Sequence, residues 1–179
     1  MAQLPKNLLR NYFSGLTEQT FMETLGIGDP ALIDYLSGLL VRFLHMDDLH
    51  RLAQLPGRKF EEVAEMLLIA QGMPDGGLTK REVFRHIGDF TLFWTGVYPE
   101  ALKRLRSWES RDCLINYTSQ GKRSYLIASS FEEDEDREQC QILRRLSDSF
   151  ELCALGLNQV RKEWEHQRPS PHQNPVIWH

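Results

Sequence analysis

Apolar residues recur along this chain at the three- and four-residue spacing of α-helices, and the alternation typical of strands is nearly absent. Asp29 followed by Pro30 is typical of a helix start, with the aspartate as N-cap and the proline in the first turn. The apolar positions that follow at helical spacing are Leu32, Leu36, Leu39, Leu40 and Phe43. This pattern predicts a helix from residue 30 to about residue 52.

Two further helices are predicted between glycine and proline breaks. After Pro56 and Gly57, the segment KFEEVAEMLLIAQG is amphipathic and has Gly72 as its stop. Thr79 and Glu82 have the spacing of a capping box, in which each side chain satisfies a backbone amide of the first turn. The sequence therefore predicts a second long helix that starts at Thr79 and ends near residue 96.

Proline and small polar residues predict the next two starts. Pro99 suits the first turn of a helix over PEALKRLRSW. Ser110 or Asp112 is placed to cap another helix that runs to about residue 131, and Gly121 predicts a bend or a split within it.

The most regular apolar pattern lies in the last long segment. Its apolar residues follow one another at alternating steps of three and four: Leu143, Leu146, Phe150, Cys153, Leu157, Val160 and Trp164. Residues beside this seam are small or uncharged, such as Ser147 and Ala154, so the charge ladder of a free-standing coiled coil is missing. We interpret the segment as one long helix that lies either in the core or in a dimer interface.

Together these elements predict an all-α, single-domain helical bundle of roughly six or seven helices over residues 1–165, because each apolar stripe must be buried against another helix. Residues 166–179 hold three prolines, which predicts an extended or disordered tail.

Composition narrows the class of protein. Apolar residues make up 41% and charged residues 26% of the 179-residue chain, as in ordinary soluble domains. The formal net charge of −4 gives no reason to expect nucleic acid as a partner. The three cysteines form no C-x-x-C pair, and there is neither an apolar leader nor a membrane-length run, so we expect reduced thiols, no membrane association and a cytoplasmic location.

The segment RHIGDFTLFWTGVYPE is the part of the chain that most resembles a site. Glu82, His86 and Asp89 lie along one flank of the predicted helix, and an imidazole beside a carboxylate suits a metal ligand or a general base. The competing interpretation pairs Asp89 with Arg85 and packs His86 against apolar neighbours. Gly88 and Asp89 are both weak helix formers, so we expect close helix packing at the glycine and a buried ion pair or cap from the aspartate.

Other candidate chemistry is weaker. Asp47 with His50, and Glu163 with His166, repeat the carboxylate–histidine spacing, but both pairs fall near predicted helix ends. No nucleophile elbow, phosphate loop or dinucleotide fingerprint is present, so we predict no catalytic residue, no metal ligand and no cofactor. The basic pair Lys122 and Arg123 could contact phosphate. A solvent-exposed helix face explains the pair more simply.

Several phrases occur together in the order YLSGLLVRFLH, EEVAEMLLIA, RHIGDFTLFWTGVYPEALKRL, QGKRSYLIASSF and LRRLSDSFELCALGLNQVR. Read in that order, they resemble an uncharacterised family of small bacterial helical proteins, over most of residues 30–161. The resemblance implies a bacterial origin and an all-helical fold, and it implies no activity.

Three hypotheses about function remain open, and the weakest of them is phosphate or nucleic-acid contact through Lys122 and Arg123. The first is a cytoplasmic, non-enzymatic helical protein that binds itself or another protein through the apolar seam, with interface residues Leu143, Leu146, Phe150, Leu157, Val160 and Trp164. The alternative is a small-molecule or metal-binding helical protein whose pocket is lined by His86, Asp89, Trp94 and Tyr98.

Overall fold

The structure, a computed structural model, describes residues 6–44, 58–74, 78–108, 116–131 and 136–167. The described residues are almost entirely helical and form eight α-helices and a short π-helical turn, without a strand. The prediction of an all-α bundle is confirmed. The motif of Asp47 and His50, and the proposed caps at Ser110 and Asp112, lie outside these residues.

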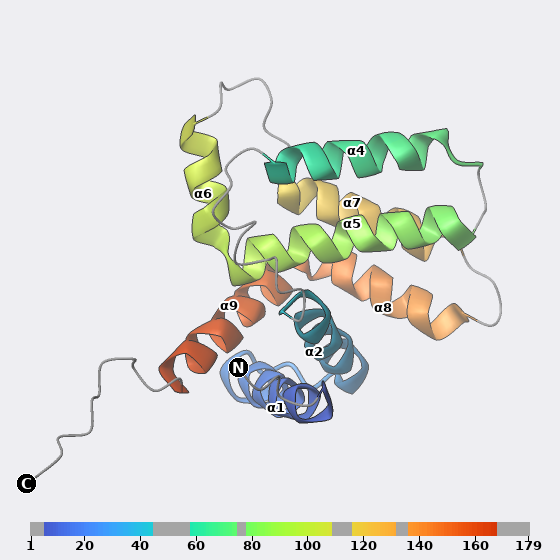
Figure 1. Cartoon of the computed structure of the whole chain (residues 1–179). Coiled ribbons are helices and arrows are strands. Elements are labelled where there is room, and N and C mark those ends of the chain that lie inside the picture. The colour runs from blue at the N-terminus through green and yellow to red at the C-terminus, as the bar shows by residue number, and fades with distance from the viewer. Residues whose placement is uncertain (1–5, 45–57, 75–77, 109–115, 132–135, 168–179) are drawn as a thin grey trace, which may run out of the picture.

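The first two helices pack against each other at one end of the molecule (Figure 1). Helix α1, Lys6–Gln19, runs directly into the π-helical turn η1, Thr20–Thr24. Gly26 then adopts a left-handed backbone conformation with a φ of 67°, which glycine tolerates because it has no Cβ. Helix α2, Pro30–Leu44, follows, and the backbone amide of Leu32 donates to Oδ1 of Asp29 at 3.2 Å. The predicted aspartate cap is confirmed.

The middle of the chain forms helices α4, Arg58–Gly72, α5, Leu78–Val97, and α6, Pro99–Trp108. The predicted end at Gly72 and the predicted start at Pro99 agree with these bounds. The predicted capping box does not agree with the bounds of α5, because the helix begins at Leu78 and Thr79 therefore lies inside the first turn. The carboxylate of Glu82 instead pairs with Nη2 of Arg85 at 2.6 Å, one turn further along the helix.

Helix α7, Tyr117–Ser129, is capped by Asn116, whose Oδ1 accepts from the amide of Ser119 at 3.1 Å. The helix continues through Gly121, so the expected split there is wrong. A Cβ at this glycine would lie 2.4 Å from Cε2 of Phe150 and 2.5 Å from Oγ1 of Thr91. Gly121 therefore serves close packing between helices.

The last segment is two helices, α8, Arg137–Asp148, and α9, Phe150–Gln167, where the sequence predicted one. The break lies at Ser149, which leaves the helical conformation with φ −111° and ψ 25°. Serine and aspartate compete for backbone hydrogen bonds, and three such residues in a row, 147–149, weaken the helix there. Helix α9 also extends two residues into the predicted tail; residues 168–179 lie outside the described part.

Helix α5 holds the bundle together. It packs against α7 and α9, and it also contacts α2, α4 and α6 (Figure 1). Ile87, Leu92, Phe93 and Trp94 of α5 are fully buried in one hydrophobic cluster that includes residues of each of these partners. Burial of this apolar surface is the main source of stability. The packing of α5 also places its polar residue Asp89 in the interior of the bundle.

Candidate functional site

A buried carboxylate lies in the middle of α5. Asp89 is 3% exposed, and a carboxylate so far from water needs partners that replace its hydration. Its neighbour Gly88 lets α7 approach closely: a Cβ at position 88 would lie 2.6 Å from Cδ1 of Tyr125. The expected tight packing at the glycine is present, and the aspartate forms an ion pair with Arg42, whose side chain is 50% exposed.

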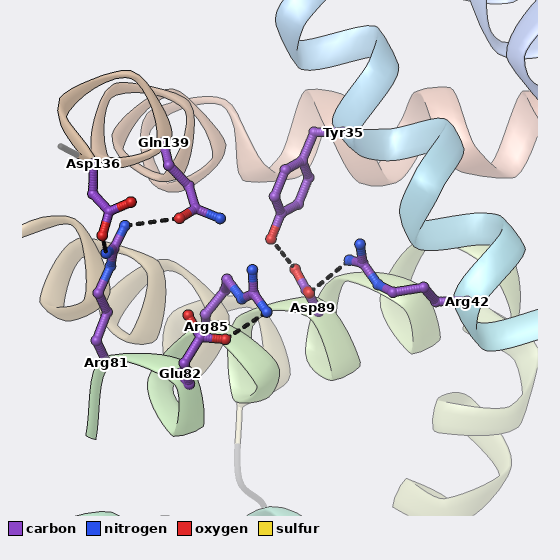
Figure 2. A network of polar contacts seen from close by, with 8 residues as sticks. All are labelled: Tyr35, Arg42, Arg81, Glu82, Arg85, Asp89, Asp136 and Gln139. Carbon is purple, nitrogen blue, oxygen red and sulfur yellow. Dashed lines mark hydrogen bonds and ion pairs between the residues drawn. The ribbon is translucent and has the colours of Figure 1, made fainter. Parts of the chain in front are cut away.

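Three side chains from two other helices surround the carboxylate. The hydroxyls of Tyr35 in α2 and Tyr125 in α7 donate to Oδ1 at 2.7 and 2.8 Å. Nη2 of Arg42 in α2 donates to Oδ2 at 2.9 Å, as Figure 2 shows with the bond from Tyr35. We call Tyr35, Arg42, Asp89 and Tyr125 the Asp89 cluster. It joins α2, α5 and α7 through one side chain.

The electrostatics of the cluster follow from its burial. Burial raises the pKa of the Asp89 carboxyl, and Arg42 and the two tyrosine hydroxyls offset part of this rise because they stabilise the anion. Burial also raises the pKa of the hydroxyls of Tyr35 and Tyr125, and the nearby Asp89 charge raises both further. The two hydroxyls therefore stay protonated and keep donating to the aspartate at neutral pH.

A row of charged side chains continues along α5 from this cluster. Arg85 does not bind Asp89 directly, because its guanidinium is held by Glu82 (Figure 2). Arg81 is almost completely buried, and its guanidinium donates to Asp136 at 2.6 Å and to Gln139 of α8 at 3.0 Å. The predicted pair of Asp89 with Arg85 is wrong, since Arg42 from another helix takes that position.

The residues expected to line a pocket differ in how deeply they are buried. His86 is exposed and its ring stacks on Phe43 with 6.0 Å between centroids, whereas Asp89 and Trp94 are buried. Tyr98 is half-buried beyond the end of α5, with the guanidinium of Arg161 4.7 Å above its ring. The rings of Trp94 and Tyr98 pack on each other with 5.5 Å between centroids, whereas of the four residues only Asp89 belongs to the Asp89 cluster.

Sequence reasoning missed the three partners of Asp89. Tyr35 and Arg42 are seven residues apart and so share one face of α2, which is the one signal that places them together. Their pairing with α5, and that of Tyr125, depends on how three helices pack. Helical spacing within one segment contains no information on this packing.

The seam proposed as a core or an interface lies inside this chain. Leu143, Leu146, Phe150 and Leu157 have no exposed surface, and Val160 is 1% exposed. Trp164 is half-buried and meets the ring of Phe13 edge-on, with 5.5 Å between centroids. Burial of the seam favours its interpretation as a core element, because a partner chain would have to replace contacts that the chain already makes.

The remaining candidates are isolated groups. Nζ of Lys122 is held by the carboxylate of Glu151 at 2.8 and 3.1 Å, and Arg123 is exposed. Glu163 and His166 are exposed near the end of α9. Over the part of the chain that the structure describes, no group of three or more histidine, cysteine or acidic side chains is arranged to hold a metal ion.

Among the described helices none is long and apolar enough to span a lipid bilayer. Comparison of the chain with protein-family models, with curated proteins and with solved structures found no match. The resemblance to small bacterial helical proteins therefore stays a prediction.

Proposed function

We propose that this protein is a cytoplasmic, non-enzymatic helical protein that acts by binding another protein through its surface. The observation that supports the proposal is the state of Asp89: both carboxylate oxygens are occupied by side chains of the same chain, at 2.7 to 2.9 Å. A general base or a metal ligand needs an oxygen that substrate or metal can reach. The Asp89 cluster instead has the composition of a structural hydrogen-bond network. Such a network fixes the positions of the helices and so holds a binding surface in a fixed shape.

Binding to a second copy of the chain is included in the proposal, but through exposed residues and not through the buried seam. Leu152 and Leu155 on the outer side of α9 are 41% and 50% exposed. Scattered exposed leucines are normal on a monomer. Sedimentation velocity at increasing concentration, with Leu155→Glu as the matched variant, measures whether they support a dimer.

The test of the proposal compares the wild-type chain with Asp89→Asn, which keeps an acceptor for the tyrosine hydroxyls. Each purified protein is immobilised and exposed to extract, and any retained protein is then purified and titrated against both. We expect one retained protein that binds both forms with the same stoichiometry and similar affinity, since the cluster only supports the fold.

Native mass spectrometry of the same two proteins tests the competing hypothesis of a ligand or metal site near His86 and Asp89. A small molecule or metal retained by the wild type and lost from a folded Asp89→Asn variant would contradict the proposal. So would the absence of any retained protein together with a monomeric mass.

A further inference from the structure

A groove lies between α1 and α2, on the face of α1 that points away from the core. It has a volume of about 230 Å³, and its lining residues are Ser14, Glu18, Met22, Gly28, Pro30, Ile33 and Asp34. Ile33 is 5% exposed and forms part of an apolar floor. A Cβ at Gly28 would meet no atom within 4 Å, so the space at this side is open.

Two further hollows lie next to this groove around α1. One shares Glu18 and Met22 with it, and the next extends past Gln19 and Glu23 to Glu163 and Gln167 on α9. We call the three together the α1 groove. It wraps around the end of α1 and η1, from the side that faces α2 to the side that faces α9, so its extent suits a peptide segment that crosses α1 better than a compact small molecule.

The charge of the α1 groove is of one sign. Its lining residues include the carboxylates Glu18, Glu23, Asp34 and Glu163, and they include no lysine or arginine. In the described chain none of these four carboxylates takes part in an ion pair, although Asp29 pairs with Arg145 close by. Unpaired like charges along a groove attract a cationic partner and favour its approach.

An apolar anchor lies in the middle of these charges. Met22 is 51% exposed and lines two of the three hollows, while the preceding residue, Phe21, is fully buried against Gly156. Methionine side chains are flexible and polarizable, and they are frequent on surfaces that accept apolar groups of varied shape. The π-helical geometry of η1 is also frequent at functional sites.

We propose that the α1 groove binds a cationic amphipathic segment of a partner protein. Apolar side chains of the segment contact Met22 and Ile33, and its lysines or arginines lie against Glu18, Glu23 and Asp34. This inference rests on the proposed function and names the chemistry of the partner. It assigns α1 and η1 as the binding elements. The Asp89 cluster keeps its structural role of joining α2, α5 and α7.

The experiment uses the full chain and a fluorescent leucine–lysine amphipathic peptide of about 18 residues, which is long enough for about five helical turns. A leucine–glutamate peptide of equal length is the control probe. We expect the cationic peptide to bind with micromolar affinity that weakens as salt is raised, and hydrogen exchange to slow in residues 14–34 on binding. We expect no comparable binding of the acidic peptide.

Two pairs of charge reversals locate the site. Glu18→Lys combined with Glu23→Lys should weaken binding of the cationic peptide by about tenfold, since two attractions become repulsions. Glu65→Lys combined with Asp148→Lys makes the same change in net charge at exposed positions on α4 and α8 and should leave the affinity within about twofold. Met22→Gln provides a third variant that changes the apolar anchor without changing charge.

Equal losses from both charge-reversal pairs would overturn the assignment, because the attraction would then be a property of net charge. Failure of the wild type to bind the cationic peptide, or equal binding of the acidic one, would overturn it as well. A dimer abolished by the groove reversals would assign the groove to a second copy. A partner captured by the chain and bound equally well by the groove variants would reject this inference while leaving the proposed function intact.

Discussion

Oδ1 of Asp89 accepts from two tyrosine hydroxyls at once, and this shared acceptor controls how Tyr35 and Tyr125 respond to pH. Burial and the aspartate raise the pKa of both hydroxyls in the folded chain. Their contribution to stability is therefore complete below about pH 10, the ordinary tyrosine value, and is lost as pH rises above it. Each hydroxyl also donates a hydrogen bond to the Asp89 carboxyl, and such a bond stabilises a fold by about 1.5–3 kcal/mol where the acceptor is charged.

The first prediction concerns this alkaline range. As the pH rises above about 10, the free energy of unfolding should fall in the wild type, and the fall should be smaller in a double variant with Tyr35→Phe and Tyr125→Phe. Urea unfolding at each pH measures both. An identical fall in wild type and variant would show that the two hydroxyls titrate normally and that the cluster is open to water.

The second prediction concerns Cys153, which has no exposed surface. Burial, with a smaller effect of Asp29, raises the pKa of its thiol to about 12. The thiolate is the reactive form, so Cys153 should not react with a disulfide reagent at neutral pH while the chain is folded. A variant with Cys113→Ser and Cys140→Ser leaves this thiol alone, and its rapid labelling without denaturant would contradict the burial of α9.

At the scale of the elements, glycines decide how closely the helices approach. A Cβ at Gly156 of α9 would lie 2.2 Å from Cζ of Phe21 in η1, and one at Gly96 would lie 2.9 Å from Cβ of Leu157. Such distances are shorter than van der Waals contact, so a side chain there must push two elements apart. Gly15 on the open face of α1 has no neighbour within 4 Å of the same position.

The third prediction compares these two kinds of glycine. Gly156→Ala should lower the free energy of unfolding by about 1–3 kcal/mol because of overpacking against Phe21. Gly15→Ala should raise it by about 0.5–1 kcal/mol, because alanine loses less backbone entropy in a helix and meets no atom here. Denaturant unfolding of both variants measures the difference. Stabilisation by both substitutions would mean that α1 and α9 pack more loosely than described.

At the scale of the whole molecule, the sequence predicted the helices better than their contacts. Starts marked by Asp29 and Pro99 were found because caps and prolines act within one turn. The break at Ser149 was missed because the apolar seam continues across it without a change of phase. The apolar seam could not distinguish a core helix from an interface helix, since either arrangement buries the same side chains.

For the site, the sequence identified Gly88 and Asp89 as residues that need a tertiary explanation, because their helix propensity is low. It did not identify Arg42, Tyr35 or Tyr125 as the partners, because these lie 36 to 54 residues away along the chain. The nearby Arg85 seemed the better partner at helical spacing. The packing of α2 and α7 on α5 determines which side chains pair with Asp89. That packing is a property of the folded core and not of any one segment.

The central claim is that Asp89 has a structural role: its hydrogen bonds and ion pair join α2, α5 and α7. The most direct measurement is the free energy of unfolding of Asp89→Ala, with Asp89→Asn as the conservative variant. We predict a loss of about 2–4 kcal/mol for alanine, since two buried hydroxyls and Arg42 lose their acceptor, and a clearly smaller loss for asparagine. An alanine variant as stable as the wild type would show that the carboxylate does not hold these helices together.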